Sequence, residues 1–175
     1  MTAVIASLTY QPAASAMAAP YRFNRVAVAT ARLIAGHGIE GDWKAGRNPK
    51  RQINLVARET LDGLAREGYR TGPGEIGEQI VVRGLDLMAL APGSRLRLGE
   101  SALIEITMAR TPCDWLGLVQ GKPDAPTAAQ GRVGVMARVI EGGIVRVGDP
   151  VQVIGGGGAQ ATTSASASGS TVDST

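Results

Sequence analysis

The feature that most constrains the fold is a series of short aliphatic runs that alternate with polar residues and are separated by glycine-containing turns. In the segment SRLRLGESALIEITMAR, Leu96 and Leu98 alternate with arginines before the Gly99-Glu100 turn, and Ile104 lies in a similar alternation after it. A period of two places apolar side chains on one face of an extended strand. The segment therefore predicts a β-hairpin, and the whole pattern predicts a mainly β protein.

The same pattern returns near the end of the chain, in VGVMARVIEGGIVRVGDPVQVI. Gly142-Gly143 has the composition of a tight turn between two strands. Asp149-Pro150 would end the next strand, because proline cannot donate a hydrogen bond to a sheet. We expect a second hairpin or a meander here.

One helix is predicted from Ala57 to Glu67, where Leu61 and Leu64 keep helical spacing on one face and charged residues occupy the other. Gly68 would end this helix. Short strands at close spacing with one or two short helices favour a small β-barrel, closed or nearly closed, because closure removes exposed sheet edges. The mouth of such a barrel is a natural ligand site.

The length and the distribution of residue types predict one folded domain followed by a tail. The chain has 175 residues, of which 44% are apolar, and this is enough for one domain with a buried core. From Gly155 onward, Gly, Ser, Thr and Ala dominate, so little there can be buried. We expect a folded domain over residues 1–154 and a disordered tail over residues 155–175.

The sequence predicts neither a membrane segment nor an export signal. No apolar run reaches the length of about 18 residues that a membrane-spanning helix needs. The apolar segment from Ala3 to Leu8 is short for a signal peptide, and no Lys or Arg precedes it. We therefore expect a cytoplasmic protein that has no membrane partner.

The residue composition excludes several classes of site. A single cysteine rules out an internal disulfide and a zinc site built from several thiolates, and it suits a reducing compartment. A single histidine, His37, rules out multi-histidine metal sites and leaves at most one Ser-His-Asp arrangement. Aromatic residues make up 3% of the chain, which disfavours a nucleic-acid reader based on stacked rings. No nucleic-acid partner is expected.

The strongest candidate for chemistry is Cys113, in the segment ARTPCDWLGL after the predicted strand that ends near Met108. A loop position makes the thiol accessible, and Arg110 would favour the thiolate, which is the form that attacks sulfur electrophiles and binds metals. Asp114 acts against this effect. A lone cysteine is more often a buried and inert small hydrophobic residue. From the residues alone, the reactive and the structural interpretations both stay open.

Two further segments carry polar residues that suit a binding site. AGHGIEGDWKAG surrounds Asp42 with glycines, Gly41 among them. This composition fits either a backbone that approaches a ligand closely or a turn that Asp42 holds by hydrogen bonds. KRQINLV offers Arg51, Gln52 and Asn54 at the start of an aliphatic strand, which gives one guanidinium and two amides for an anionic, hydrogen-bonding ligand. Solvent exposure explains Arg51 equally well.

A third segment, GPGEIGEQIVVRGLDL, contains Glu75 and Glu78. Paired carboxylates are typical of glycosidases, but the scarcity of aromatic residues for a sugar-binding groove disfavours that interpretation.

Taken together and in order, the segments resemble the MOSC family, named for the C-terminal domain of molybdenum cofactor sulfurases. The resemblance spans roughly Ile5 to Ile154 and uses GIEGDWKAG, RQINLV, PGEIGEQIVVRGLDL, LAPGSRLRLGESALIEIT, RTPCDWL and GVMARVIEGGIVRVGDPVQV. Each motif alone is unspecific, but their order around a cysteine that follows a strand is specific. The chain is most similar to small stand-alone bacterial members, several of which are associated with the detoxification of N-hydroxylated bases.

The resemblance implies a β-barrel domain that binds the molybdenum cofactor (molybdopterin), with Cys113 at the position of the family cysteine. That cysteine either ligates molybdenum in oxidoreductases of N-hydroxylated compounds or carries sulfur as a persulfide, and both uses need a thiolate. A sulfur donor or a redox protein would be the partner. The resemblance assigns two roles to the other candidates: pterin-phosphate binding by Arg51, Asn54 and Arg110, and shaping of the pocket by Gly41, Asp42 and Glu78.

Two residues depart from the family pattern. Lys44 stands where histidine is common, and Gln79 stands where asparagine is common. Lysine keeps a positive charge for phosphate or pterin binding but offers no neutral nitrogen ligand, so we expect no catalytic base at this position. The sequence does not contain the aminotransferase-like domain of full sulfurases, so pyridoxal phosphate is linked to this chain only through its family.

Two other hypotheses stay open at this point. One is a non-catalytic module that delivers sulfur to a partner protein. The other is a plain barrel that binds a small anionic ligand, in which Cys113 is a structural residue.

Overall fold

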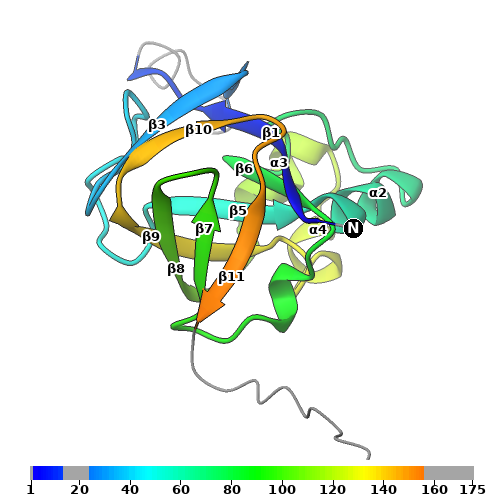
Figure 1. Ribbon diagram of the computed structural model, residues 1–175. Coiled ribbons are helices and arrows are strands. Elements are labelled where there is room, and N and C mark those ends of the chain that lie inside the picture. The colour runs from blue at the N-terminus through cyan, green and yellow to red at the C-terminus, as the bar shows by residue number, and fades with distance from the viewer. Residues whose placement is uncertain (1, 14–23, 156–175) are drawn as a thin grey trace, which may run out of the picture.

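The computed structural model describes residues 2–13 and 24–155, which form eleven strands in two sheets (Figure 1). The larger sheet has eight strands in the order β11-β7-β8-β9-β5-β6-β1-β2, and the smaller one has the order β10-β3-β4. The prediction of a mainly β protein is confirmed. The strands are β1 (Val4–Tyr10), β2 (Val26–Val28), β3 (Thr30–Ile34), β4 (Gly38–Ile39), β5 (Ile53–Ala57), β6 (Ile80–Arg83), β7 (Arg95–Leu98), β8 (Ala102–Ala109), β9 (Val135–Glu141), β10 (Gly143–Arg146) and β11 (Val151–Gly155).

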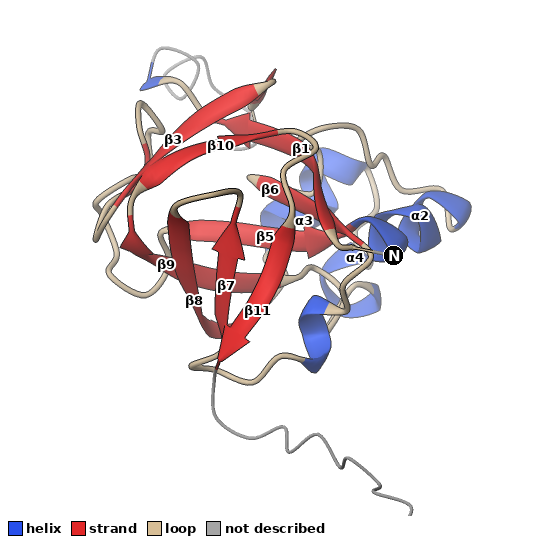
Figure 2. Cartoon of the chain, viewed as in Figure 1, coloured by secondary structure: helices blue, strands red, loops and turns tan. Residues whose placement is uncertain are grey.

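Three α-helices lie within the described residues and gather on one side of the strands (Figure 2). They are α2 (Arg58–Arg66), α3 (Asp114–Gln120) and α4 (Ala125–Ala128), and a short 3-10 helix, η1, spans Leu87–Ala89. The first matches the helix predicted from its apolar spacing. The expectation of one or two helices was too low, because α3 and α4 are short and contain Gly117 and Pro126, so they show little helical periodicity.

Strand β5 lies at the centre of the molecule and is buried along its whole length. Ile53 and Leu55 belong to the core enclosed by the sheets, whereas Val56 packs with α2 and α3 in a second apolar cluster. A strand covered on both faces needs an aliphatic run rather than simple alternation. β5 connects through α2 to β6, which pairs with it in parallel. This βαβ unit supplies two sides of the pocket described below.

The large sheet is not closed into a barrel, because its order ends at β11 on one side and at β2 on the other. The gap is narrow. Ile5 N donates to Asp149 O at 2.9 Å, Val151 N donates to Ala3 O at 2.8 Å, and Val4 forms an isolated bridge with Pro150. A proline at this point supplies no N–H, which limits the pairing between the two strands.

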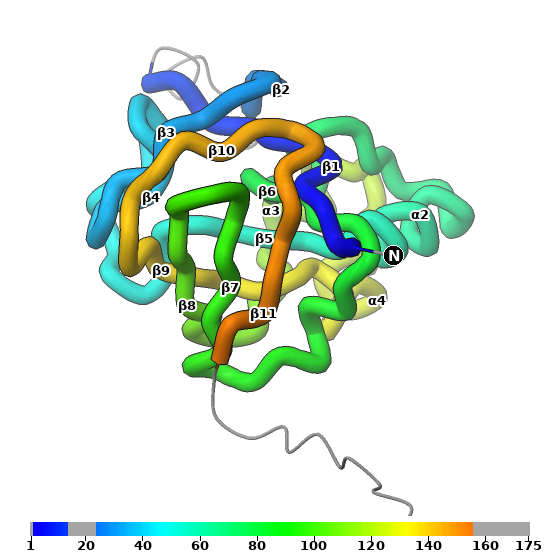
Figure 3. Tube along the Cα trace, in the orientation of Figure 1, coloured from blue at the N-terminus to red at the C-terminus, as the bar shows by residue number. Residues whose placement is uncertain are grey.

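The first predicted hairpin is confirmed, since β7 and β8 pair antiparallel on either side of Gly99. The second prediction was wrong. Strand β10 follows β9 after Gly142, but it pairs with β3 across the molecule, with Ile144 opposite Arg32 (Figure 3). β11 in turn pairs with β7. The Gly142-Gly143 step therefore transfers the chain between sheets instead of reversing it within one.

The predicted tail begins at Gly155, which is the last residue of β11. The rest of that prediction, over residues 156–175, lies outside the described residues.

Candidate functional site

A pocket of about 270 Å³ opens beside Cys113, where several segments distant in sequence meet. It brings together five of the eight predicted site residues: Lys44, Arg51, Asn54, Arg110 and Cys113. The other three, Gly41, Asp42 and Glu78, do not line it. Six further described residues line it: Arg25, Gln52, Gly77, Gln79, Thr111 and Met136. Sequence reasoning had offered Gln52 as an amide for a ligand, and it had assigned the other five to no site.

The backbone on both sides of Cys113 is fixed, while the residue itself is exposed. On the upstream side, Arg110 N donates to Gly134 O at 2.9 Å as β8 ends. On the downstream side, Leu116 N donates to Cys113 O at 2.8 Å, and the Leu116 side chain is buried in the helical cluster. The fold therefore presents the thiol at the pocket rim from a well-anchored loop.

Gln120 anchors the end of α3 to the loop before β6. Its Oε1 accepts a hydrogen bond from Arg70 N at 2.8 Å, and its Nε2 donates to Arg70 O at 3.0 Å and Glu75 O at 2.9 Å. Arg70 also donates from its guanidinium to Val119 O. These contacts couple the helix that follows Cys113 to the loop that carries Gly77.

Among the residues that the structure describes, four cations line the pocket and no acidic side chain does. Arg110 is 8% exposed, and its guanidinium donates to Val133 O at 3.3 Å. Burial lowers the pKa of Arg110 to about 10, partly offset by the charge of Glu78, so the side chain stays a cation at neutral pH. The side chain of Arg25 is buried and forms an ion pair of 3.3 Å with Asp42. Burial also lowers the pKa of Arg25.

Arg25 lies in the segment YRFNRVAV, which has no motif, so it resembles an ordinary surface charge before a strand. Only the tertiary pairing of its guanidinium with Asp42 brings it to the pocket. The sequence contains no local signal that would have found it.

Asp42 acts behind the pocket by holding the glycine-rich turn, as one of the two sequence interpretations proposed. Its carboxylate accepts hydrogen bonds from Gln11 N at 3.0 Å, Lys44 N at 2.8 Å and Gln79 Nε2 at 3.1 Å. Gly41 precedes it with a φ of 77°, a conformation that L side chains rarely adopt. The two residues shape the site by fixing the backbone of Lys44 and the side chain of Gln79.

Asn54 presents an unsatisfied acceptor at this site. Its Nδ2 donates to Gly77 O at 3.0 Å, and its backbone N donates to Gln79 Oε1 at 2.9 Å. Its Oδ1 is buried and has no hydrogen-bond partner among the described residues, and the same is true of Arg25 Nε. Buried polar atoms without partners are rare and costly, so two of them at one pocket point to a ligand that supplies the missing partners.

Glu78 lies behind the pocket wall, where it is 1% exposed. Its carboxylate accepts hydrogen bonds from Gly74 N at 2.5 Å and Ile76 N at 3.1 Å. Glu75 accepts in the same way from Gly72 N at 2.9 Å and from Arg70 Nε at 3.1 Å. Both carboxylates hold the loop in shape, and neither lines the pocket. This arrangement gives no support to a glycosidase-like pair.

The buried Glu78 makes stability depend on pH in a defined direction. Burial raises the pKa of Glu78 above its usual value of 4.5, because the charged form is poorly solvated. A raised pKa gives stability that is fully present below the usual value and is lost as the pH rises through the raised one. Glu78→Gln removes this titration. We expect wild type to lose stability relative to the variant as the pH rises above the usual value of 4.5, in urea unfolding at several pH values. A relative gain over this range would contradict the assignment.

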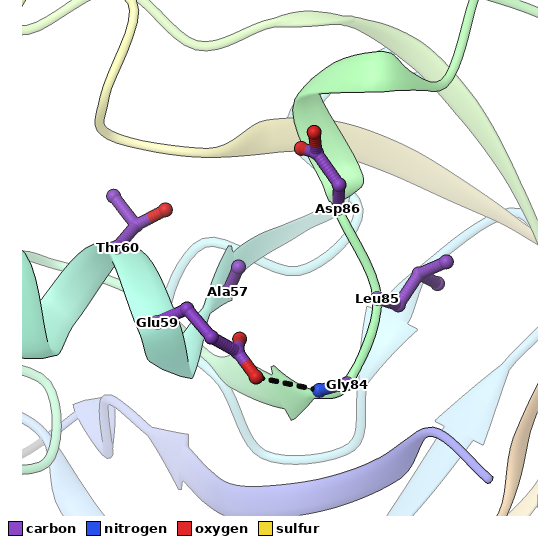
Figure 4. A pocket seen from close by; sticks show the side chains of 6 residues that line it. All are labelled: Ala57, Glu59, Thr60, Gly84, Leu85 and Asp86. Atoms are coloured by element: carbon purple, nitrogen blue, oxygen red, sulfur yellow. Dashed lines mark hydrogen bonds between the residues drawn. The ribbon is translucent and has the colours of Figure 1, made fainter. Parts of the chain in front are cut away.

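A second hollow, of about 500 Å³, lies at the start of α2 and is an unsuitable site (Figure 4). Both of its carboxylates already hold backbone amides: Glu59 accepts from Gly84 N at 2.8 Å, and Asp86 accepts from Met88 N at 3.0 Å. The described residues that line it include neither a cysteine nor a cation. Although this hollow is larger, the convergence of thiol, cations and unsatisfied polar atoms favours the Cys113 pocket.

Two further properties concern metals and membranes. Across residues 2–13 and 24–155, no group of three or more His, Cys, Asp or Glu side chains is placed to hold a metal ion. A metal carried within an organic cofactor does not require such a group. No helix in the described part of the chain is long and apolar enough to cross a membrane.

Comparison with known proteins gives a family and several similar structures. The family model described as "MOSC domain" matches residues 42–152. The chain is 26% identical to the YuaD protein from Bacillus subtilis, with a TM-score of 0.71, over 86% of this chain and 94% of that one. YiiM from Escherichia coli is 25% identical, with a TM-score of 0.65, over 87% and 70% of the two chains. YiiM from Geobacillus stearothermophilus, at 22% identity and a TM-score of 0.65 over 87% and 75%, shows the shared fold alone. No curated protein matches the sequence.

Proposed function

Because this chain belongs to the MOSC domain family, we propose that the pocket beside Cys113 binds the molybdenum cofactor, with the Cys113 thiolate as a ligand to the metal. The observation that carries the proposal is the placement of the only cysteine, exposed, in one pocket with four cationic side chains. A thiolate suits a metal, and the cations suit an anionic group on the same ligand.

The residues of the pocket fit such a ligand in charge. Arg25, Lys44, Arg51 and Arg110 surround a space that no carboxylate enters, and Asp42 neutralises only part of this charge from behind. Arginine binds phosphate oxygens through its planar fork, and a partly buried site strengthens the attraction. Arg51 and Arg110 would hold the phosphate, and Lys44 would add a mobile positive charge.

The pocket also fits a ligand that carries hydrogen-bond donors. Gly77 O fixes the Asn54 amide, so that Oδ1 remains the unsatisfied atom. A pterin ring carries N–H groups that would satisfy it. Gln79 supports this arrangement by bridging Asn54 N and Asp42. Asn54 would therefore orient the ring, while the cations hold its anionic end.

When bound, the cofactor would supply two-electron redox chemistry of the kind used to reduce N-hydroxylated compounds. The chain's own residues would bind and orient it. Cys113 would hold the metal at the open rim of the pocket, where a substrate can approach. The open rim would also let solvent supply protons to the substrate.

Native mass spectrometry of the full chain, expressed with an intact molybdenum-cofactor pathway, tests this function. The expected result is an additional mass that corresponds to one phosphate-bearing pterin cofactor per chain. A chain that retains only a small inorganic anion would contradict the proposal and favour a plain anion-binding domain.

A second function, persulfide sulfur transfer, is supported by the exposure of Cys113. The Cys113 thiolate would attack the outer sulfur of a donor persulfide, forming a new S–S bond while the donor leaves as a thiolate. The product would be a persulfide on Cys113. Intact mass after incubation with a cysteine desulfurase and cysteine would then show an increase of about 32 Da, one sulfur atom, that Cys113→Ala abolishes. An unchanged wild-type mass would contradict sulfur transfer.

Arg110→Met tests the anion-binding role of the pocket. The variant removes a buried cation and retains a long apolar stem, so we expect cofactor affinity to fall about 10- to 100-fold, the value of one charge-assisted contact. Arg110→Lys keeps the charge but loses the planar guanidinium, so its cofactor affinity should lie between that of Arg110→Met and that of wild type. The measurement is the fraction of chains that retain cofactor through purification. Wild-type retention in Arg110→Met would show that Arg110 does not hold the ligand.

A further inference from the structure

The thiol of Cys113 lies at the pocket rim, so any protein that exchanges electrons or sulfur with the site must approach this face. The segment from Lys44 to Arg51 forms one side of the rim. It contains four cations and no acidic residue, and all four cations are exposed. We call this segment the basic loop. Both of its ends line the pocket together with Cys113.

Two of these cations, Arg47 and Lys50, lie outside the pocket lining and have their charges available to a partner. Arg47, Lys50 and Arg51 form no ion pair with any acidic side chain in the described part of the chain, although Arg47 stacks on Trp43 at 3.6 Å. Elsewhere on the surface, six other arginines are paired with carboxylates: Arg58, Arg70, Arg95, Arg97, Arg132 and Arg138. Other exposed arginines, Arg83 among them, also form no ion pair with a described residue, but the basic loop places Arg47, Lys50 and Arg51 within five consecutive residues beside the thiol.

An exposed apolar side chain lies in the helix that follows Cys113. Leu118 of α3 is 69% exposed, more than any other large apolar side chain in the described part of the chain. It follows Asp114, the first residue of the helix, by four residues, so it lies on the same helix face as Asp114, the neighbour of Cys113 in the chain. Gln120 fixes α3 to the loop before β6, so this side chain is presented from a rigid support.

We propose that the basic loop, Cys113 and Leu118 together form a docking surface for an acidic protein that serves the thiol site. The partner is one with a carboxylate-rich surface around an apolar centre, because complementary charge accelerates association and an exposed leucine gives the contact an apolar anchor. The proposal extends the cofactor or sulfur-carrier function proposed above, since it names the kind of protein that delivers electrons or sulfur to that site.

The proposed docking surface can be changed by mutation without changing the residues that line the pocket. Arg47, Lys50 and Leu118 do not line the pocket, so their substitution leaves the proposed ligand contacts intact. Lys50 is held by its backbone, since Thr107 Oγ1 donates to Lys50 O at 2.5 Å, and its side chain is free to vary. The matched control is Arg83→Glu, an exposed arginine at the opposite end of β6 from Gln79.

The test uses the full chain, expressed without cofactor synthesis so that the thiol is free, and two synthetic peptides of equal length. Each peptide carries one cysteine as a mixed disulfide with thionitrobenzoate, flanked in one case by glutamates and a leucine and in the other by glutamines and a leucine. The Cys113 thiolate attacks the peptide sulfur, a Cys113–peptide disulfide forms, and thionitrobenzoate leaves as a coloured anion. The neutral reagent 4,4′-dithiodipyridine reports the intrinsic reactivity of the thiol.

We expect the acidic peptide to react about tenfold faster than the neutral one at low salt, and this preference to disappear in the Arg47→Glu, Lys50→Glu double variant. Leu118→Ser should slow both peptides equally. Arg83→Glu should change neither rate, and the neutral reagent should react alike with all variants. Equal rates for the two peptides with wild type, or the same loss of preference in Arg83→Glu, would overturn the proposal.

Molybdenum content separates this result from the proposed function. When expressed with the cofactor pathway, the double variant should retain as much molybdenum as wild type. If wild type holds no molybdenum and still prefers the acidic peptide, the cofactor proposal fails while the docking surface stands. If molybdenum is bound and the preference is absent, the docking surface fails alone.

Discussion

Gly134→Ala is expected to destabilise the protein by about 3–5 kcal/mol, the range of the largest single-residue effects. Gly134 has a φ of 86°, and a Cβ built on it would lie 1.9 Å from Leu55 O and 2.8 Å from Val56 Cγ2. The first contact is with the backbone of the central strand, which cannot move without disturbing both apolar clusters. Equilibrium unfolding in urea measures the loss.

A matched glycine separates the clash from the backbone conformation. Gly93 has a φ of 90°, but a Cβ there would meet nothing within 4 Å. Gly93→Ala should therefore cost only about 1 kcal/mol, the penalty for an L residue at positive φ. Equal losses in the two variants would show that the close approach to Leu55 is not the cause.

Gly134→Ala should also disturb the pocket. Gly134 O accepts the hydrogen bond from Arg110 N that fixes the end of β8, and Met136 lines the pocket two residues later. A shift of this backbone moves Arg110 and, through the following loop, Cys113. The fold and the site are therefore coupled through one glycine, to which sequence reasoning assigned no role.

The parts of the fold that could be predicted from the sequence are those set by local contacts. The β7–β8 hairpin was predicted because two alternating runs flank Gly99 and pair with each other. The partner of β10 was not, since its pairing with β3 joins residues far apart in the chain, and the Gly142-Gly143 step has the same composition whether the chain reverses or changes sheet. Alternation reports the buried face of a strand and leaves its neighbour undetermined.

The site residues likewise include some that the sequence predicted and some that it did not. Cys113, Arg51, Asn54, Arg110 and Lys44 lie in recognisable segments, and the structure places them around one pocket.

Arg25 and Glu78 show which properties of the site the sequence could not predict. Arg25 reaches the pocket only through tertiary structure, because its ion pair with Asp42 joins two segments that do not neighbour each other in sequence. Glu78 has the residue type of a functional group but acts as a buried acceptor for the loop amides of Gly74 and Ile76. Residue type predicts what a side chain can do, whereas burial decides whether it meets a ligand.

Cys113→Ser is expected to lower the molybdenum retained by the purified chain at least about tenfold, since even indirect changes around a metal cost 10- to 100-fold in affinity. Serine is similar in size but is a poor ligand where a thiolate is needed. Because residue 113 is exposed, the substitution should change the free energy of unfolding by less than about 0.5 kcal/mol. A lower molybdenum content in Cys113→Ser could therefore not be attributed to unfolding of the protein.

Met136→Leu is the matched control, because Met136 is the other sulfur-containing side chain that lines the pocket. Leucine has nearly the same volume, so the pocket keeps its shape. This variant should retain molybdenum like wild type.

The molybdenum-to-protein ratio, measured by elemental analysis on wild type, Cys113→Ser and Met136→Leu expressed with an intact cofactor pathway, tests the central claim most directly. Direct ligation by Cys113 predicts metal in wild type and Met136→Leu and its loss in Cys113→Ser. Equal molybdenum in wild type and Cys113→Ser would contradict ligation by this thiol.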